Sequence, residues 1–171
     1  ARKKAEDALE VSNVRFTYAS EATSDALWDW NMITNEIFVG ESYASLFGYQ
    51  FENNIIPGEF CENLVHIEDK EKYEESIDIA IADGKQRWSY EYRYLKADGN
   101  YAHVSDKAII IRDAEGNPVR MIGAMQDITQ EKQLKDELLQ SEERFKGAFF
   151  NSSFGMAIVD LEGYWAEVKE G

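Results

Sequence analysis

The fold is decided by residues 86–129, which read QRWSYEYRYLKADGNYAHVSDKAIIIRDAEGNPVRMIGAMQDIT. Three runs of β-forming residues are separated there by the turn sequences ADGN and DAEGNP, which can join neighbouring antiparallel strands. Side chains alternate along a strand, so one face of the first run carries Trp88, Tyr90, Tyr92 and Tyr94. After the third run the spacing becomes helical. The stretch therefore predicts an antiparallel meander that leads directly into a helix.

The segments EYRYLKADGNYAHV, IRDAEGNPV and MIGAMQDIT follow one another in this order, and EKQLKDELLQSEERF comes next. This combination resembles the C-terminal half, or PAC motif, and the exit linker of a PAS domain, a sensory module of bacterial signalling proteins. The resemblance extends over residues 15–129 as one unit. It implies an α+β PAS fold, in which a five-stranded antiparallel sheet carries short helices on one face and is flanked by N- and C-terminal connector helices.

The chain before residue 86 supplies the other two strands and the short helices. Residues 25–30, DALWDW, alternate as a strand, and a turn returns the chain to a second strand at 36–39. The next segment, SYASLFGYQ, predicts a short helix that ends at Gly48, because glycine most easily adopts the left-handed C-cap conformation. We therefore expect five strands in total.

A longer helix is predicted between His66 and Gly84. Its first residues, HIED, resemble a His-Pro-Glu-Asp element of the family, with Ile67 in the place of proline. The acidic residues would lie at the positive end of the helix dipole. Residues 50–67, which precede this helix, are expected to be irregular.

A repeat at one constant offset connects the two ends of the chain. Asp7, Leu9, Ser12, Arg15, Phe16 and Ala19 recur as Asp136, Leu138, Ser141, Arg144, Phe145 and Ala148. Tandem units are therefore predicted, and we expect the sequence to be a piece of a longer chain. The predicted parts are a connector helix at 1–14, a PAS domain at 15–129, a coiled-coil linker helix at 130–144 and the truncated start of a second PAS domain at 145–171.

Spacings of four and three alternate along both predicted connector helices, as in the seam of a coiled coil. The positions are Ala5, Leu9, Ser12, Phe16 and Ala19, and they recur as Leu134, Leu138, Ser141, Phe145 and Ala148, with Ser141 as a weak point. The candidate seam residues are Leu9, Phe16, Leu134, Leu138 and Phe145. They predict a homodimer that forms through the connector helices.

The resemblance places ligands between the helices and the sheet. The candidate lining residues are Trp28, Trp30, Phe38, Tyr43, Phe47, Tyr73, Ile77, Trp88, Tyr90, Tyr92 and Met125. The same large side chains could instead fill a solid core, since apolar linings and core fillings look alike in sequence. The sequence leaves both alternatives open.

No cofactor and no metal site are predicted. A flavin photosensor of the family would need a cysteine in an Asn-Cys-Arg-Phe-Leu-like helix, but Cys61 lies in GEFCENL, and Met125 stands where that branch uses glutamine. Haem would need an axial histidine on the helix after His66, which has none. We interpret His66 as a helix-entry residue and His103 as a strand-surface residue. An unknown small ligand remains possible.

Asp127, Ile128 and Thr129 form the predicted joint between the last strand and the linker helix. Asp127 and Thr129 are good N-cap residues, which would stiffen this connection. Glu91 and Arg93 share the strand face opposite the tyrosines. They are interpreted as a solvated face or a dimer surface.

The chain of 171 residues is 44% hydrophobic and has a formal net charge of −15. This charge argues against binding to nucleic acid or to anionic membranes, because both require basic residues. A single cysteine excludes an internal disulfide, and no apolar run is long enough to span a bilayer. No arrangement of catalytic residues is recognisable, so no catalytic site is predicted in this fragment.

Two functions remain at this stage. The favoured one is a cytoplasmic sensory or relay module, whose partners are adjacent PAS and output domains in the parent chain. The resemblance implies a two-component sensor histidine kinase as the parent, with a phosphorelay, and less often a diguanylate cyclase. The alternative is a ligand-free scaffold that dimerises and spaces output domains. Any membrane segment would lie elsewhere in the parent.

Overall fold

The structure is a computed structural model, and it describes residues 25–151, 156–159 and 165–169. The chain divides into two compact units, one that ends at Thr129 and one that begins at Gln130. The predicted connector helix at 1–14, with the seam residues Leu9 and Phe16, lies outside the described residues.

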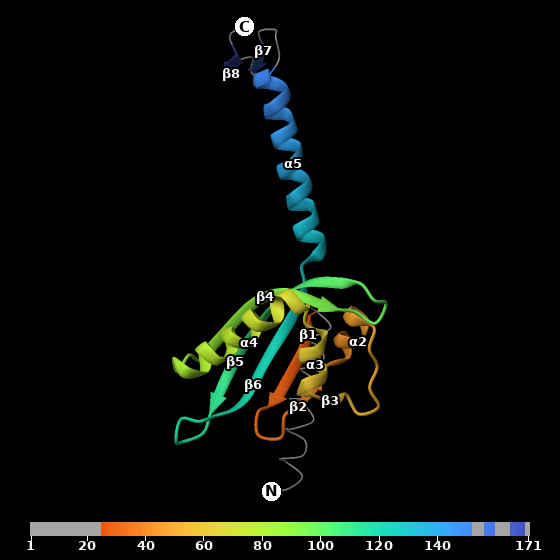
Figure 1. The fold of residues 1–171 in the computed structure, drawn as a ribbon, viewed down its shortest axis with the longest axis vertical. Coiled ribbons are helices and arrows are strands. Elements are labelled where there is room, and N and C mark those ends of the chain that lie inside the picture. Colours follow the sequence, from red (N-terminus) through yellow and green to blue (C-terminus); the bar gives the residue numbers. More distant parts are fainter. Residues whose placement is uncertain (1–24, 152–155, 160–164, 170–171) are drawn as a thin grey trace, which may run out of the picture. The chain divides into compact units, whose positions relative to one another are not determined.

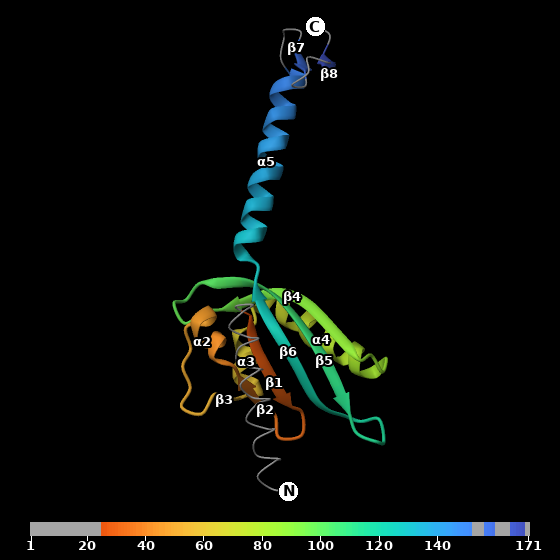
Figure 2. The ribbon, with the colours of Figure 1, turned by 180° about the vertical axis from the view of Figure 1, so that it is seen from behind.

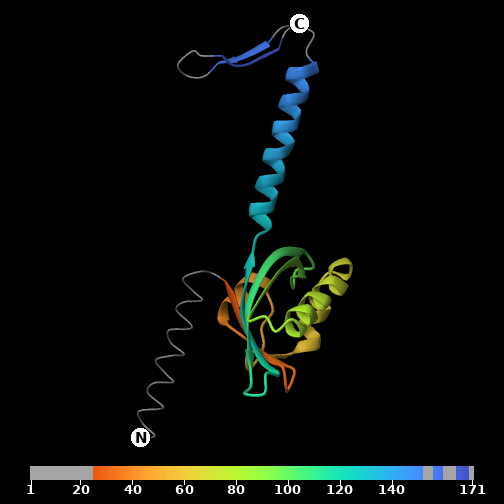
Figure 3. The same cartoon turned by 90° about the vertical axis from the view of Figure 1, so that its left-hand side faces the viewer.

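The first unit is built on an antiparallel sheet of six strands in the order β3-β2-β1-β6-β5-β4 (Figure 1). The strands are β1 Ala26–Asn31, β2 Glu36–Val39, β3 Ile55–Pro57, β4 Arg87–Leu95, β5 Tyr101–Arg112 and β6 Pro118–Asp127. The helices of this unit are α2 Glu41–Phe47, α3 Gly58–Leu64 and α4 Ile67–Ala82. Viewed from behind and from the side, α3 and α4 lie on one face of the sheet (Figures 2 and 3). The predicted α+β architecture, an antiparallel sheet with short helices on one face, is confirmed.

The prediction of five strands was wrong by one. The sixth strand, β3, lies in the stretch that we expected to be irregular, and it pairs with β2 through Phe38 and Ile55. Two consecutive isoleucines favour the strand, and Pro57 is tolerated because β3 is an edge strand. Helix α3 follows at once, so this stretch is more regular than its sequence indicates.

The meander forms as the turn sequences predict, with β4 paired to β5 and β5 paired to β6. Gly99 in the first turn has φ +87°, a conformation that favours glycine. Gly123 in β6 is required for a different reason. A Cβ at this position would lie 2.5 Å from the ring of Trp28 and 2.7 Å from the backbone oxygen of Lys107. The indole of Trp28 therefore packs directly over the backbone of β6.

The core lies between the sheet and the helices. Tyr43 of α2 is almost fully buried, and its ring packs edge-on against Phe47 and Tyr94 with centroid distances of 5.0 and 6.5 Å. The hydroxyl oxygens of Tyr43 and Tyr94 are 2.8 Å apart and share a hydrogen bond. Gly48 ends α2 in the left-handed conformation, as predicted.

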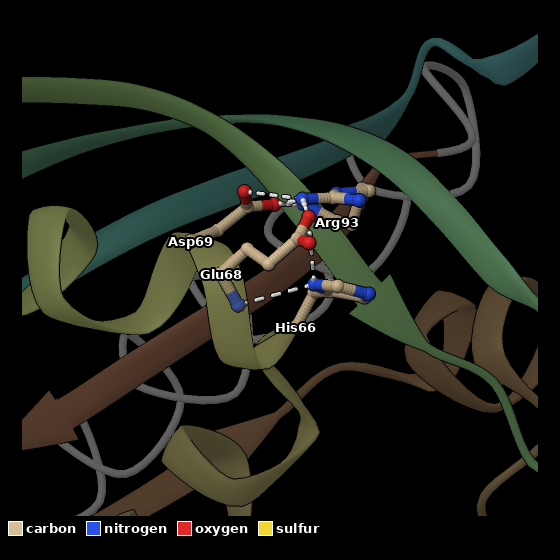
Figure 4. Close-up of polar contacts among 4 residues, drawn as sticks. All are labelled: His66, Glu68, Asp69 and Arg93. Carbon is tan, nitrogen blue, oxygen red and sulfur yellow. Dashed lines mark hydrogen bonds and ion pairs between the residues drawn. The ribbon is translucent and has the colours of Figure 1, made fainter.

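The start of α4 is attached to the free edge of β4 by a cluster of polar residues, His66, Glu68, Asp69 and Arg93 (Figure 4). The Asp69 carboxylate accepts hydrogen bonds from the backbone N and the Nε of Arg93 at 2.9 Å and from its Nη2 at 2.8 Å. Glu68 accepts another from Nη2 at 2.8 Å. His66 caps the helix, because its Nδ1 accepts from the backbone N of Glu68 at 3.2 Å.

This cluster corrects the interpretation of Arg93 as a residue of a merely solvated face or of a dimer surface. Because β4 is the last strand of the sheet, the Arg93 side chain can bend around its edge to reach α4. The role predicted for His66 as a helix-entry residue is confirmed.

Helix α5 spans Thr129–Asn151, so its first residue is the last residue of the first unit and the rest of it belongs to the second. The second unit also contains a hairpin of β7 Met156–Val159 and β8 Trp165–Lys169. The predicted seam residues Leu134, Leu138 and Phe145 are 58%, 60% and 52% exposed. None of the helices in the described ranges is both long and apolar enough to span a membrane.

Candidate functional site

A cavity lies in the core of the first unit, between the sheet and helices α2, α3 and α4. The space open to the centre of a water-sized sphere is about 40 Å³, enough for roughly three water molecules. Fourteen residues from eight strands and helices line it. They are Trp28, Trp30, Ile37, Val39, Tyr43, Cys61, Tyr73, Ile77, Trp88, Tyr92, Tyr94, Asp106, Met121 and Met125. We call this space the inner cavity.

Asp106 of β5 supplies the carboxyl group of the inner cavity and is only 2% exposed. Its Oδ1 accepts a hydrogen bond from Nε1 of Trp28, and its Oδ2 accepts one from the hydroxyl of Tyr92, both at 2.9 Å. Burial raises the pKa of Asp106 to about 7, although both hydrogen bonds favour the charged form and oppose this rise. The carboxyl group is therefore poised between its neutral and charged forms near neutral pH.

The indole N–H of Trp88 in the wall finds its hydrogen-bond acceptor in Ser76 of α4, which is not itself a lining residue. Nε1 of Trp88 donates to Oγ of Ser76 at 2.9 Å, and this hydroxyl donates to the backbone oxygen of Tyr73 at 2.7 Å. Burial raises the pKa of the Cys61 thiol to about 11. Because the thiolate is the reactive form, Cys61 is a poor nucleophile at neutral pH.

A second space of about 120 Å³ adjoins the inner cavity on the side of α3 and α4. We call it the outer cavity. The residues that line both spaces are Trp30, Ile37, Cys61, Tyr73 and Ile77. The outer cavity also has Gly58 and three acidic residues, Glu62, Glu74 and Asp78, in its wall. The space that adjoins the inner cavity is therefore bordered by acidic side chains.

Eight of the eleven candidate lining residues contribute to the inner cavity, namely Trp28, Trp30, Tyr43, Tyr73, Ile77, Trp88, Tyr92 and Met125. Phe38 does not, and its placement in the lining was wrong. It is 41% exposed, because the alternation of β2 turns Ile37 and Val39 inward instead. Phe47 is buried beside Tyr43 but is not part of the wall.

Tyr90 is also outside the wall, although it lies in β4 between two lining residues. It is half-buried, and its ring stacks against Tyr92 with centroids 6.5 Å apart. Sequence reasoning missed Asp106, which proved to be the central polar residue. The sequence did contain an indication of its burial, because Asp106 is two residues from both Val104 and Ala108 and therefore shares the buried face of β5 with them.

The predicted joint between sheet and helix is held by three hydrogen bonds. Oδ1 of Asp127 accepts from the backbone N of Thr129 at 2.9 Å. Oγ1 of Thr129 accepts from the backbone N of His103 at 2.9 Å, and the backbone N of Ile128 donates to the oxygen of His103 at 2.8 Å. The Ile128 side chain is 8% exposed. The first residue of α5 is thus bonded both to the end of β6 and to β5.

Within the described part of the chain, no three His, Cys, Asp or Glu residues are placed to hold a metal ion together. The chemistry available at the inner cavity is therefore that of one carboxyl group, several hydroxyl and indole groups and a large aromatic surface. Such a wall is suited to binding a small molecule.

Comparison with known proteins gives a family match for the first unit. A family model described as "PAS fold" matches residues 36–125. The chain is 25% identical over 134 residues to the methyl sulfide methyltransferase-associated sensor of Methanosarcina acetivorans. It is 26% identical over 161 residues to DgcE of Escherichia coli K12, described as a probable diguanylate cyclase. These matches cover 78% and 94% of this chain but span only 13% and 14% of the relatives.

A solved structure with a similar fold is that of a sensory box histidine kinase/response regulator from Burkholderia thailandensis E264. The TM-score is 0.65 at 24% sequence identity, and the match covers 77% of this chain and 98% of the other. At this identity the likeness concerns the fold.

Proposed function

Because the chain belongs to the PAS family of sensor domains in signal-transduction proteins, we propose that its first unit binds a small ligand in the inner cavity and passes the resulting change to α5. The main support for this proposal is that β5 and β6 each have one residue in the wall of the inner cavity and another residue at the joint. On β5, Asp106 lies three residues after His103, which bonds to Thr129. On β6, Met125 lies in the wall two residues before Asp127.

A shift of either strand at the inner cavity would therefore act on the hydrogen bonds that define the start of α5. Packed strands and helices move as rigid elements between a small number of arrangements. The expected output is a rotation or a change of register of the helix. Hydrogen exchange at the Ile128 and Thr129 amides should change when a ligand binds, whereas exchange in the Gly116 turn should not.

The parent protein is proposed to be a two-component sensor histidine kinase, with a diguanylate cyclase as the alternative. The sequence resemblance supports the first, and similarity to DgcE supports the second. In either case we propose that the unit works in the cytoplasm and is joined to adjacent PAS and output domains.

Dimerisation through α5 is part of this proposal. Leu134, Leu138 and Phe145 recur at spacings of four and seven and are each more than half exposed. This exposure supports a coiled-coil seam, because burial of such side chains favours helix association. Together with the predicted seam residues Leu9 and Phe16, they would form a parallel homodimer.

A ligand-free scaffold is the second candidate function. The small volume of the inner cavity favours it, since sites for drug-sized ligands are typically about 300–1,000 Å³. In that case the aromatic residues would serve only to stabilise the fold, and α5 would dimerise and space the output domains.

Tryptophan fluorescence distinguishes the two functions, because Trp28, Trp30 and Trp88 line the inner cavity. A panel of metabolites should contain a compound that changes the emission of the purified chain, and native mass spectrometry should show one bound molecule. Ile77→Phe, which fills the inner cavity, should abolish the response. Ile79→Phe on the exposed side of α4 is the matched control. No response to any compound, together with a tight dimer in light scattering, would favour the scaffold.

A further inference from the structure

The inner cavity combines one acidic group with an aromatic wall. Asp106 is its single acidic side chain, and none of the fourteen lining residues is lysine or arginine. Seven of them are aromatic, namely Trp28, Trp30, Tyr43, Tyr73, Trp88, Tyr92 and Tyr94. The faces of aromatic rings carry negative potential and attract organic cations, most strongly where water is excluded. Both features of the wall favour a positively charged ligand.

The approach to the inner cavity has the same electrostatic preference. Glu62, Glu74 and Asp78 lie in the wall of the outer cavity, and no lysine or arginine lines it, although Nζ of Lys70 lies 4.0 Å from Oε1 of Glu74 on the same helix. Acidic residues that converge on a cleft concentrate cations there and repel anions. A ligand that enters through the outer cavity therefore meets negative charge before it reaches Asp106.

We propose that the ligand is a small aliphatic ammonium compound, whose cationic group binds beside Asp106 among the aromatic rings of the inner cavity. The inference rests on the proposed function, because it names the chemical class of the ligand for the same cavity. A carboxylate has about four lone-pair sites, and the donors to Asp106 are the Trp28 indole, the Tyr92 hydroxyl and the backbone of Lys107, so a site remains for a further partner. Anionic and uncharged ligands would lack an equivalent partner.

The size of the two cavities restricts the ligand. The inner cavity, at about 40 Å³, has room for a compact head group only, and the remaining chain would extend into the outer cavity of about 120 Å³. Met121 and Met125 in the wall have flexible side chains, which can shift to admit methyl groups on the nitrogen. Short-chain amines and methylated ammonium compounds fit this description.

Binding of a cation should be linked to loss of the Asp106 proton, because only the carboxylate pairs with the ligand. With a pKa of about 7, Asp106 releases about half a proton per cation bound at pH 7. The affinity should rise from pH 6 to pH 8 and then level off.

The buried tyrosine and cysteine side chains around Asp106 do not titrate in this pH range. Burial keeps the pKa values of Tyr43, Tyr92 and Tyr94 well above the usual tyrosine range, and it does the same for Tyr73 on α4. The Cys61 thiol on α3 also remains protonated, with a pKa of about 11. The acidic groups that face the space from α3 and α4 are those of Glu62, Glu74 and Asp78 in the outer cavity.

Calorimetric titration of the 171-residue chain with choline tests the proposal. The matched probe is 3,3-dimethylbutan-1-ol, which has the same shape without the charge. We expect binding of choline with an affinity at least tenfold above that of the uncharged compound. Asp106→Asn should weaken choline binding by roughly 30-fold or more, the loss typical of removing one partner of a buried charge pair. Asp83→Asn, which removes an exposed carboxylate outside both cavities, is the control.

Titrations in buffers of different ionisation enthalpy measure the released proton on the unaltered chain, so the test does not depend on the folding of the variant. Methylammonium is titrated in parallel as the smaller cation. Equal binding of choline and its uncharged isostere, or retention of choline binding by a folded Asp106→Asn variant, would overturn the inference while leaving a ligand-binding cavity in place. Failure of both cations to bind would also overturn it. The proposed function falls only if the metabolite panel and native mass spectrometry find no ligand either.

Discussion

The molecule holds two aspartates in opposite electrostatic states, Asp69 at the edge of β4 and Asp106 in the inner cavity. Asp69 is partly exposed and bonded to a guanidinium group, and the hydrogen bonds from Arg93 lower its pKa to about 2. Asp106 is buried among uncharged donors, and burial raises its pKa to about 7. The Asp69 carboxylate thus holds a structural ion pair with Arg93, whereas the Asp106 carboxyl group can gain or lose its proton near neutral pH. The difference arises from the charge of the partners and from access to water.

The largest expected effect comes from removing the buried carboxyl group. Asp106→Ala leaves the Trp28 indole N–H and the Tyr92 hydroxyl without their acceptor in the core. Each unsatisfied buried donor costs about 1–3 kcal/mol, so the free energy of unfolding should fall by about 3 kcal/mol in urea denaturation. Asp106→Asn retains one acceptor oxygen and should cost less. Equal losses in the two variants would show that these hydrogen bonds do not stabilise the fold.

A second variant disturbs Asp106 indirectly. Gly123→Ala places a methyl group against the Trp28 ring and the backbone oxygen of Lys107. Overpacking of this kind costs about 1–3 kcal/mol, and we expect about 2 kcal/mol in the same denaturation experiment. The near-ultraviolet circular dichroism of the indole should also change. Gly147→Ala on α5, where an added Cβ has nothing within 4 Å, should not destabilise the protein.

The edge cluster should contribute less, because it is partly exposed. Arg93→Ala removes its side-chain hydrogen bonds to Asp69 and Glu68, and a loss of about 1–2 kcal/mol is expected. A double-mutant cycle with Asp69→Ala should give a coupling energy of about 1 kcal/mol. Arg120→Ala removes a more exposed pair with Asp29 and provides the comparison. If Arg93→Ala lowered the free energy of unfolding no more than Arg120→Ala does, the position of Arg93 at the sheet edge would give no additional stability.

The two aspartates should give the free energy of unfolding opposite dependences on pH. The folded-state pKa of Asp69 is lowered, so its stabilisation is present above about pH 4 and is lost as the pH falls toward 2. The folded-state pKa of Asp106 is raised, so stability should decrease as the pH rises from about 4 to 7 and then level off.

Urea denaturation at a series of pH values separates these two contributions. Arg93→Ala should flatten the acidic limb, and Asp106→Asn should remove the decrease between pH 4 and 7. A decrease that persists in a folded Asp106→Asn variant would contradict the raised pKa of Asp106.

Much of the fold was readable from local patterns. The turn sequences after β4 and β5, the C-cap at Gly48 and the aromatic alternation of β4 each depend on a few neighbouring residues. The extra strand β3 was missed because two isoleucines before Pro57 are too short a signal for a strand. Phe38 was misplaced because the four residues of β2 do not show which of their two faces is buried.

The sequence predicted the aromatic part of the candidate site but not its charged residue or the partners of Arg93. Most of the aromatic residues that line the inner cavity were recognised by size and alternation, but Asp106 was not among the candidates. Likewise, Arg93 was interpreted as a residue of a solvated face or of a dimer surface, although it bonds around the edge of the sheet to α4. Both errors concern hydrogen-bond partners that are distant in sequence. Asp69 lies 24 positions from Arg93, and the partners of Asp106 lie on β1 and β4.

The sequence by itself determined five of the six strands of the sheet, the turns between β4, β5 and β6, the capped start of α5 and the family, because these follow from residue types at short separations. Only the tertiary structure decided the ionisation behaviour of the two aspartates. The pKa of a carboxyl group depends on the charges and the water around it, and these are set by which distant residues the fold brings together. Arg93 reaches Asp69 across the sheet edge, whereas Trp28 and Tyr92 enclose Asp106 in the core.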